Sequence, residues 1–280
     1  MATVAELLRE AATLDSDSAQ LDAQLLLCHV LGRDRTWLYT WPEVELDERA
    51  CDRFRTLLAK RREGHPIAHL LEVREFWSLP LKVSTATLIP RPDTELMVEC
   101  ALALDLSASA RVLDLGTGTG AIALALASER PNWLVSGVDR VDDAVALARA
   151  NALALGLQRV DFWRSNWFDA VAAQFDLILS NPPYVAQDDP HLAEGDVRFE
   201  PRSALVAADQ GYADLAHIIA GARGYLAPGG WLMLEHGAQQ GERVREMLAA
   251  NGYSRIETAR DYGGRERVTC GQWPEEDRNG

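Results

Sequence analysis

Three glycines alternate with two threonines in the run DLGTGTG, at residues 114–120, between a strand-like and a helix-like stretch. Glycine lets the backbone turn sharply and lets a ligand approach the main chain closely. The following helix would add unpaired N–H groups and the positive end of its dipole. With Ala121 the run also satisfies the relaxed dinucleotide fingerprint GxGxxA. The sequence therefore predicts a cofactor-binding loop made of Gly116, Thr117, Gly118, Thr119 and Gly120.

Asp139 ends the next strand-like stretch, 19 residues after Gly120. A carboxylate at this place in a βαβ unit accepts hydrogen bonds from the two hydroxyls of a ribose. Because NAD and S-adenosylmethionine both carry a ribose, Asp139 predicts a nucleoside cofactor without distinguishing the two.

The tetrapeptide Asn181-Pro182-Pro183-Tyr184 follows another strand-like stretch, where open α/β sheets place their ligands. Two consecutive prolines remove two N–H donors and hold the backbone rigid, while their carbonyls remain acceptors. The Asn181 side-chain oxygen is a further acceptor, and Tyr184 supplies an aromatic face. This combination suits a planar –NH₂ group, whose hydrogens need acceptors.

These two motifs resemble those of class I S-adenosylmethionine-dependent methyltransferases that modify amide or amino nitrogens. The resemblance implies that DLGTGTG holds S-adenosylmethionine and that NPPY holds the substrate. It also implies that Asn181 contributes to the cofactor site. Adenine-N6 methyltransferases of DNA and RNA share both motifs, so the motifs indicate the chemistry and leave the substrate open.

Two further segments, REFWSLPLKVS at 74–84 and LIPRPDTE at 88–95, resemble the family of N5-glutamine methyltransferases that act on peptide chain release factors. The resemblance implies methylation of the glutamine in a Gly-Gly-Gln motif. It also implies that the Asn181 side chain and the Pro182 carbonyl accept the two amide hydrogens, and that Pro183 and Tyr184 wall the side chain. Trp167 would lie beside the adenine. For Arg91 and Glu95, ion pairing and ligand contact both remain open.

The elements that must position these residues alternate between strand and helix from Arg111 onward. Strand-like runs occupy 111–116, 133–139, 159–165, 175–181 and 230–237, and the clearest helix spans 142–156, with Asp142 as its N-cap and Gly156 as its terminator. This alternation predicts a doubly wound α/β sheet. Two last strands, at 255–260 and 266–272, are joined by a short glycine turn and must be antiparallel.

Residues 1–72 are instead predicted to form a small helical domain with no strand. Thr3 and Glu6 form a capping box, Ser18 can cap a second helix that ends at Gly32, and a later helix runs from about Asp47 to Arg62. We expect residues 73–90 to form a β-hairpin linker and residues 91–280 to form the methyltransferase domain. By this prediction the helical domain recognises the substrate.

The composition argues against several kinds of binding partner. The chain has 280 residues, with 28 basic and 42 acidic side chains, a net charge of −14 that argues against stable binding of nucleic acid. The four cysteines are widely spaced and offer no metal motif. We expect no metal, no membrane association and a cytoplasmic location. Open alternatives are an amino-methyltransferase acting on adenine in DNA or rRNA, an enzyme acting on a ribosomal-protein glutamine, and a non-catalytic S-adenosylmethionine-binding regulator.

Overall fold

The computed structural model describes residues 1–11, 14 and 18–275, so the last residues of the predicted methyltransferase domain, 276–280, lie outside the described residues. The chain forms two compact units. One contains residues 1–73 together with 193–199, and the other contains residues 74–192 together with the chain from residue 200 onward. Within the described residues, no helix is long and apolar enough to cross a membrane.

The first unit is built around helices, and the predicted capping box at Thr3 is present. The Thr3 hydroxyl accepts the Glu6 N–H at 3.2 Å, and Glu6 Oε2 accepts the Thr3 N–H at 2.9 Å, which completes the capping box. Asp47 caps the N-terminus of α4 (Glu48–Arg62), and Gly32 ends α2 (Ala19–Leu31) in the left-handed conformation. Its elements are β1 (Ala2–Thr3), α1 (Val4–Glu10), α2 (Ala19–Leu31), α3 (Arg35–Thr40), β2 (Glu45–Leu46), α4 (Glu48–Arg62) and α5 (Ile67–Leu71).

Two local expectations for this unit were wrong. A two-residue antiparallel pair, β1 with β2, exists where no strand was predicted, because so short a pair leaves no alternating pattern in the sequence. The hydroxyl of Ser18 donates to Asp22 at 2.9 Å and does not cap α2. Pro66 precedes α5, and a proline suits the start of a helix because the N–H that it lacks would have no helical partner there.

The hairpin of β3 (Val73–Phe76) and β4 (Leu79–Lys82) turns through Trp77 and Ser78. Both turn residues have positive φ angles, 53° and 57°, as a two-residue type I′ turn requires. From Arg74 onward the hairpin belongs to the second unit, where Phe76 and Leu81 are fully buried in the core.

The second unit contains a seven-stranded sheet in the order β10-β11-β9-β8-β5-β6-β7. All neighbouring strands are parallel except those that involve β11, so the predicted terminal antiparallel hairpin is confirmed. One cap differs: Asp142 lies in the first turn of α8, and Val141 is the N-cap. The strands are β5 (Arg111–Leu115), β6 (Leu134–Asp139), β7 (Asp161–Arg164), β8 (Phe175–Ser180), β9 (Leu226–Glu235), β10 (Ser254–Arg260) and β11 (Glu266–Gln272). The helices are α6 (Glu95–Ala103), α7 (Ala121–Glu129), α8 (Asp142–Ala154), α9 (Arg202–Leu205), α10 (Ala213–Ala222) and α11 (Gly241–Ala250).

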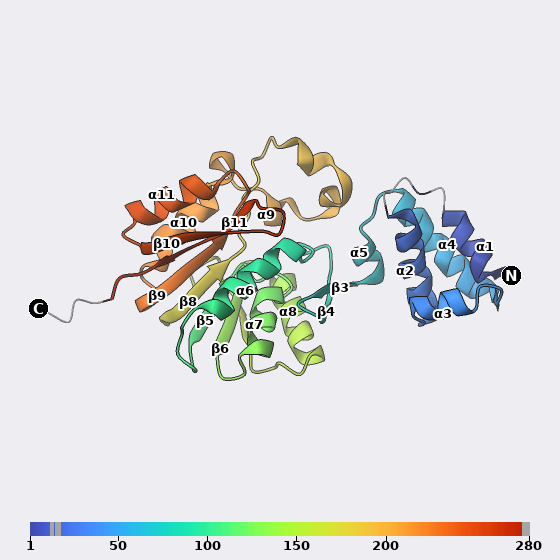
Figure 1. Cartoon of the computed structure of the whole chain (residues 1–280), viewed down its shortest axis with the longest axis horizontal. Coiled ribbons are helices and arrows are strands. Elements are labelled where there is room, and N and C mark those ends of the chain that lie inside the picture. Colours follow the sequence, from blue (N-terminus) through green and yellow to red (C-terminus); the bar gives the residue numbers. More distant parts are fainter. Residues whose placement is uncertain (12–13, 15–17, 276–280) are drawn as a thin grey trace, which may run out of the picture. The chain divides into compact units, whose positions relative to one another are not determined.

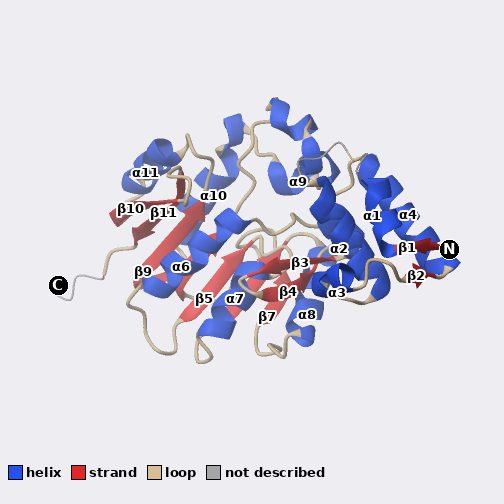
Figure 2. Ribbon diagram, turned by 45° about the vertical axis from the view of Figure 1, so that its right-hand side comes forward, coloured by secondary structure: helices blue, strands red, loops and turns tan. Residues whose placement is uncertain are grey.

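Helices cover both faces of this sheet (Figure 1). Alternate strand residues point to opposite faces. Val112 accordingly lies in the core formed with α6, α7 and α8, whereas Leu113 lies in the core formed with α10 and α11. The strands, drawn red in Figure 2, thus form the middle layer of a three-layer doubly wound unit, as predicted.

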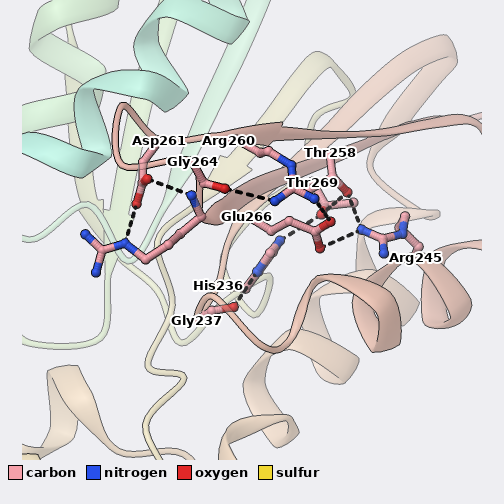
Figure 3. Close-up of polar contacts among 10 residues, drawn as sticks. His236, Gly237, Arg245, Thr258, Arg260, Asp261, Gly264, Glu266 and Thr269 are labelled. Atoms are coloured by element: carbon pink, nitrogen blue, oxygen red, sulfur yellow. Dashed lines mark hydrogen bonds and ion pairs between the residues drawn. The ribbon is translucent and has the colours of Figure 1, made fainter.

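Polar side chains join the terminal hairpin to α11 (Figure 3). Arg245 of α11 donates to Glu266 and to Thr258, each at 2.9 Å. Thr258 and Thr269 share a hydrogen bond of 2.9 Å across the hairpin, and Thr269 contacts His236 Nε2 at 2.7 Å. This network ties the last two strands to the end of β9.

Candidate active site

A cleft of about 940 Å³, including the solvent at its mouth, opens at the carboxyl ends of β5, β6 and β8. The order of the strands reverses between β5 and β8, which is the point where open α/β sheets bind ligands. Most of the predicted site residues line it: Gly116, Thr117, Gly118, Thr119, Asp139, Trp167, Asn181 and Pro183.

The glycine loop has the conformation that only glycine adopts freely. Gly116, Gly118 and Gly120 have φ angles of 71°, 55° and 82°. The backbone N–H groups of Gly116 and Thr117 donate to the Val138 carbonyl at 2.9 Å, which ties the loop to the end of β6. Gly120 caps α7 and does not line the cleft, because its Cα faces Leu124 and the aromatic ring of Phe162.

Asp139 already organises the backbone around the cleft. Its Oδ2 accepts the Gly118 N–H at 3.0 Å, and its Oδ1 accepts the Val141 N–H at 2.9 Å. Each carboxylate oxygen can accept further hydrogen bonds, so the two oxygens remain able to bind a pair of ribose hydroxyls.

Asp114 lies beneath the loop and was not predicted as a site residue. It is fully buried, and its Oδ2 accepts the Thr117 hydroxyl at 2.6 Å, while Oδ1 has no hydrogen-bond partner among the described residues. Burial raises the pKa of its carboxyl to about 7, against the lowering effect of the bond from Thr117. Its position within the DLGTGTG motif was visible, but its burial depends on the strands that surround β5.

Asn181 leaves β8 with its side chain held in one orientation. Its Nδ2 donates to Thr94 Oγ1 at 3.2 Å, which leaves Oδ1 as an acceptor at the cleft. Thr94 comes from the start of α6 and also lines the cleft. Thr94 is the residue that reasoning on the NPPY motif alone missed.

The remaining NPPY residues divide between cleft and core. Pro183 lines the cleft, whereas Pro182 is buried and Tyr184 is directed to the interior. The Tyr184 hydroxyl donates to Glu235 Oε1 at 3.2 Å, and burial raises its pKa well above the ordinary value for tyrosine. The backbone carbonyl of Tyr184 accepts the Gln240 amide at 3.1 Å.

Arg91 and Glu95 of the IPRPDTE segment, whose roles the sequence left open, make different contacts. Glu95 Oε1 accepts the Trp77 N–H at 2.8 Å, so it supports the strained turn of the hairpin. Arg91 lines the cleft and forms an ion pair with the buried carboxylate of Glu200, which also accepts the Ile89 N–H at 2.9 Å.

Trp167 follows β7 with a positive φ of 50° and presents its ring to the loop. A Cβ added at Gly116 would lie 3.5 Å from this ring, so ring and loop are in close contact. Gly116 has no side chain, so a ligand can approach its backbone closely. The Asp139 carboxylate can accept hydrogen bonds from hydroxyl groups, and the Trp167 indole offers an aromatic surface. These are the groups that a nucleoside cofactor needs, and the residues present fit S-adenosylmethionine.

Comparison with known proteins agrees with this site. Residues 2–71 match the family described as the PrmC N-terminal domain, and residues 92–196 match the methyltransferase small domain. The fold resembles that of the crystal structure of a methyltransferase from Pyrococcus furiosus, with a TM-score of 0.55 at 18% identity, covering 77% of this chain and 97% of that one. Fold and site together define a class I S-adenosylmethionine-dependent methyltransferase.

Curated relatives identify the family of this chain more narrowly. The release factor glutamine methyltransferase of Salmonella typhimurium is 58% identical, over 92% of this chain and 94% of the relative. The same enzyme of Pseudomonas aeruginosa is 54% identical, over 98% of this chain and 99% of the relative. That of Escherichia coli is 56% identical, over 92% and 94%. The chain belongs to the release factor glutamine methyltransferase family, which confirms the resemblance found in its sequence.

Proposed function

We propose that this chain transfers the methyl group of S-adenosylmethionine to the side-chain amide nitrogen, N5, of a glutamine in a peptide chain release factor. The observation that carries the proposal is the oriented Asn181 amide in the same cleft as the glycine loop. The names of relatives with more than 50% identity over nearly the whole chain support the release factor as the substrate. By the resemblance of the motifs, the glutamine is that of a Gly-Gly-Gln sequence.

An amide nitrogen is a poor nucleophile because its lone pair is delocalised into the carbonyl group. The bound sulfonium supplies an activated methyl group, so the protein must provide position and electrostatics. Asn181 Oδ1 and the Pro182 carbonyl would accept the two N–H hydrogens of the glutamine and orient the nitrogen for in-line displacement. Acceptors at these hydrogens also favour the positive charge that develops on nitrogen.

Pro183 lines the cleft and would form one wall for the flat amide. Tyr184 would support that wall from behind through its bond to Glu235, which modifies the direct contact expected from the motif. No dedicated general base is needed, since the protonated amide product is strongly acidic and loses its proton readily. Trp167 and Asp139 would hold the adenine and the ribose.

The helical unit is proposed to recognise the folded substrate. A single glutamine in a flexible glycine-rich loop offers little surface for selection, so contacts elsewhere must supply specificity. A release factor works against ribosomal RNA and should carry basic surface. Residues 71–280 of this chain carry 30 acidic and 19 basic side chains, so opposite charges would speed encounter. Such a substrate also places the enzyme in the cytoplasm, and the net charge of −14 argues against stable binding of nucleic acid.

Transfer of tritium from labelled S-adenosylmethionine tests the proposal directly. We expect label in release factor and none in a release factor whose motif glutamine is replaced, nor in DNA or rRNA. Label in nucleic acid but not in release factor would overturn the substrate in favour of an amino-methyltransferase acting on adenine. Binding of the cofactor without transfer to any of these substrates would favour a regulator.

A further inference from the structure

Arg91 is a residue of the cleft for which the mechanism above has no role. It lies directly before the short 3₁₀ turn Pro92–Thr94, and its carbonyl accepts the Thr94 N–H at 3.1 Å. Its side chain is 34% exposed and lines the cleft together with Asn181 and Pro183. The cleft therefore holds a cation that none of the proposed steps uses.

A buried carboxylate holds this guanidinium. Arg91 Nη2 donates to Glu200 Oε1, and the Ile89 N–H donates to Glu200 Oε2 at 2.9 Å. The Glu200 side chain has no exposed surface, whereas that of Arg91 is partly exposed. The other N–H groups of Arg91 have no hydrogen-bond partner within the part of the chain that the structure describes. Because arginine carries five N–H donors in a rigid planar fork, donors remain for a ligand in the cleft.

Arg91 lies at the substrate end of the cleft. Thr94, three residues further along the chain, hydrogen-bonds to the Asn181 side chain at 3.2 Å. Burial raises the pKa of the Tyr184 hydroxyl and the positive charge of Arg91 opposes that rise, which places the guanidinium near the NPPY tetrapeptide. Asp139, which is proposed to hold the ribose, bonds to the glycine loop instead. This placement favours the substrate as the ligand of Arg91.

The substrate would offer carbonyl oxygens to this cation. Glycines have no side chain, so an enzyme that binds a Gly-Gly-Gln loop can contact only the peptide groups beside the glutamine. The Asn181 side-chain oxygen and the Pro182 carbonyl are acceptors and serve N–H groups. Arg91 provides donors, and a carbonyl that leaves water for the cleft without a donor would weaken binding.

We propose that Arg91 binds a main-chain carbonyl oxygen of the substrate loop beside the glutamine, and that Glu200 is the positioning residue that holds Arg91 and neutralises its charge. The inference rests on the proposed function, since the carbonyl belongs to the release factor. Neutralisation matters because S-adenosylmethionine is a sulfonium cation and the attacking nitrogen gains positive charge. An unpaired guanidinium would repel both, whereas the Arg91–Glu200 pair offers donors without net charge.

Arg91→Lys in the full chain tests the carbonyl contact, because lysine keeps the charge and loses the planar fork. With S-adenosylmethionine at saturation, we expect the KM for release factor to rise about tenfold, as for the loss of one charged hydrogen bond. The kcat and the Kd for S-adenosylmethionine should change little. Arg202→Lys, exposed on α9 and outside the cleft lining, is the matched control and should behave as the native chain.

The same variant can overturn the contact. A raised Kd for S-adenosylmethionine with an unchanged KM for release factor would assign Arg91 to the carboxylate of the cofactor. Unchanged values of both would leave the ion pair with Glu200 as a purely structural contact. Either result contradicts the proposal.

Glu200→Gln tests the neutralising role, with the affinities for S-adenosylmethionine and S-adenosylhomocysteine as the readout. S-adenosylhomocysteine has no charge on its sulfur, so an unpaired Arg91 should weaken it less. We expect the ratio of the two Kd values, S-adenosylmethionine over S-adenosylhomocysteine, to rise about fivefold, as for one added charge in a partly screened site. Arg91→Met, which leaves the carboxylate without its cation, should lower the same ratio.

An equal effect on both ligands would overturn the neutralising role. Denaturant melts identify which of the two variants is folded, and an unchanged ratio in either folded variant is enough to contradict it. If neither folds, Arg91→Lys with an unchanged KM contradicts the proposal by itself. A native chain that does not methylate release factor would instead refute the proposed function, whereas the Kd ratio is measured without release factor and tests Glu200 separately.

Discussion

At the scale of single residues, the cleft works by fixing which atoms are donors and which are acceptors. Asp139 holds the loop through Gly118 and keeps capacity for two hydroxyl groups. Asn181 is held through its nitrogen so that its oxygen remains at the cleft. Each role can be tested separately, because we propose that Asp139 binds the cofactor and that Asn181 binds the substrate.

Replacing Asn181 by alanine should abolish most turnover. The change removes one preorganised acceptor, and we expect kcat to fall by roughly 10²–10³ while the Kd for S-adenosylmethionine changes little. Steady-state kinetics with release factor and calorimetry with the cofactor measure the two effects. Asn251→Ala, which removes a side chain that donates to the Met247 carbonyl at the end of α11, is a matched control. Near-native kcat in Asn181→Ala would refute the role assigned to this side chain.

Replacing Asp139 by alanine should, in contrast, act mainly on the binding of the cofactor. Loss of a charged hydrogen-bonding group should weaken S-adenosylmethionine binding by about 1.5–3 kcal/mol, or 10- to 150-fold in Kd. Asp143→Ala, exposed on the first turn of α8, should bind as the native chain does. Calorimetry on both variants, with NAD as a second ligand, measures the effect. Equal Kd values for S-adenosylmethionine in Asp139→Ala and the native chain would contradict the ribose contact.

At the scale of elements, close packing between β6 and β7 supports the loop. A Cβ added at Gly137 would lie 2.6 Å from Thr117 Oγ1 and 2.7 Å from the Phe162 ring. Real side chains do not approach so closely, so either the ring or the threonine must move. Because Thr117 belongs to the glycine loop, a change in the middle of a strand would reach the cofactor site.

Gly137→Ala is therefore expected to destabilise the fold and to weaken the cofactor together. Overpacking of this kind costs about 1–3 kcal/mol of unfolding free energy. Denaturant melts and cofactor calorimetry should both change, whereas Gly224→Ala, whose nearest contact would be an ordinary 3.7 Å, should change neither by much. An unaltered melting midpoint for Gly137→Ala would show that this packing is looser than described.

At the scale of the whole molecule, two units divide the work that we propose. Removing residues 1–70 should leave S-adenosylmethionine binding intact, because every residue that lines the cleft lies in the second unit. It should remove most activity on intact release factor. Calorimetry and kcat/KM measure the two properties. A truncated chain that binds cofactor and retains full kcat/KM would leave the helical unit with a role in stability or with another partner.

Buried carboxyls also give the molecule an unusual dependence of stability on pH. The pKa values of Asp114 and Glu235 are both raised to about 7 in the folded state. A raised carboxyl pKa means that the folded state holds a proton that the unfolded state releases, so the free energy of unfolding should increase as the pH falls from 8 towards 5. Below about pH 5 carboxyls whose pKa is lowered, such as Asp261 and Glu266, should reverse the trend. Denaturant melts across this range, with Glu235→Gln flattening the upper part, check the sign.

The sequence by itself determined what depends on neighbouring residues. Capping by Thr3, the sharp turn of the glycine loop, the alternation of strands and helices and the NPPY motif were all visible, because each depends on a few adjacent side chains or on a short period. Motifs this specific also indicated the family that the relatives confirm. The domain boundaries and the roles of single site residues stay predictions.

Only the tertiary structure decided which distant residues meet. Residues 193–199 belong with the helical unit, where Asp196 forms an ion pair with Arg61 at 3.0 Å and Phe199 contacts the ring of His65. Thr94 and Glu235 come from elements separated by 141 positions in the chain, yet both reach Asn181 or Tyr184. Burial and hydrogen-bond polarity arise from packing between such elements, and no local pattern of residue types encodes them.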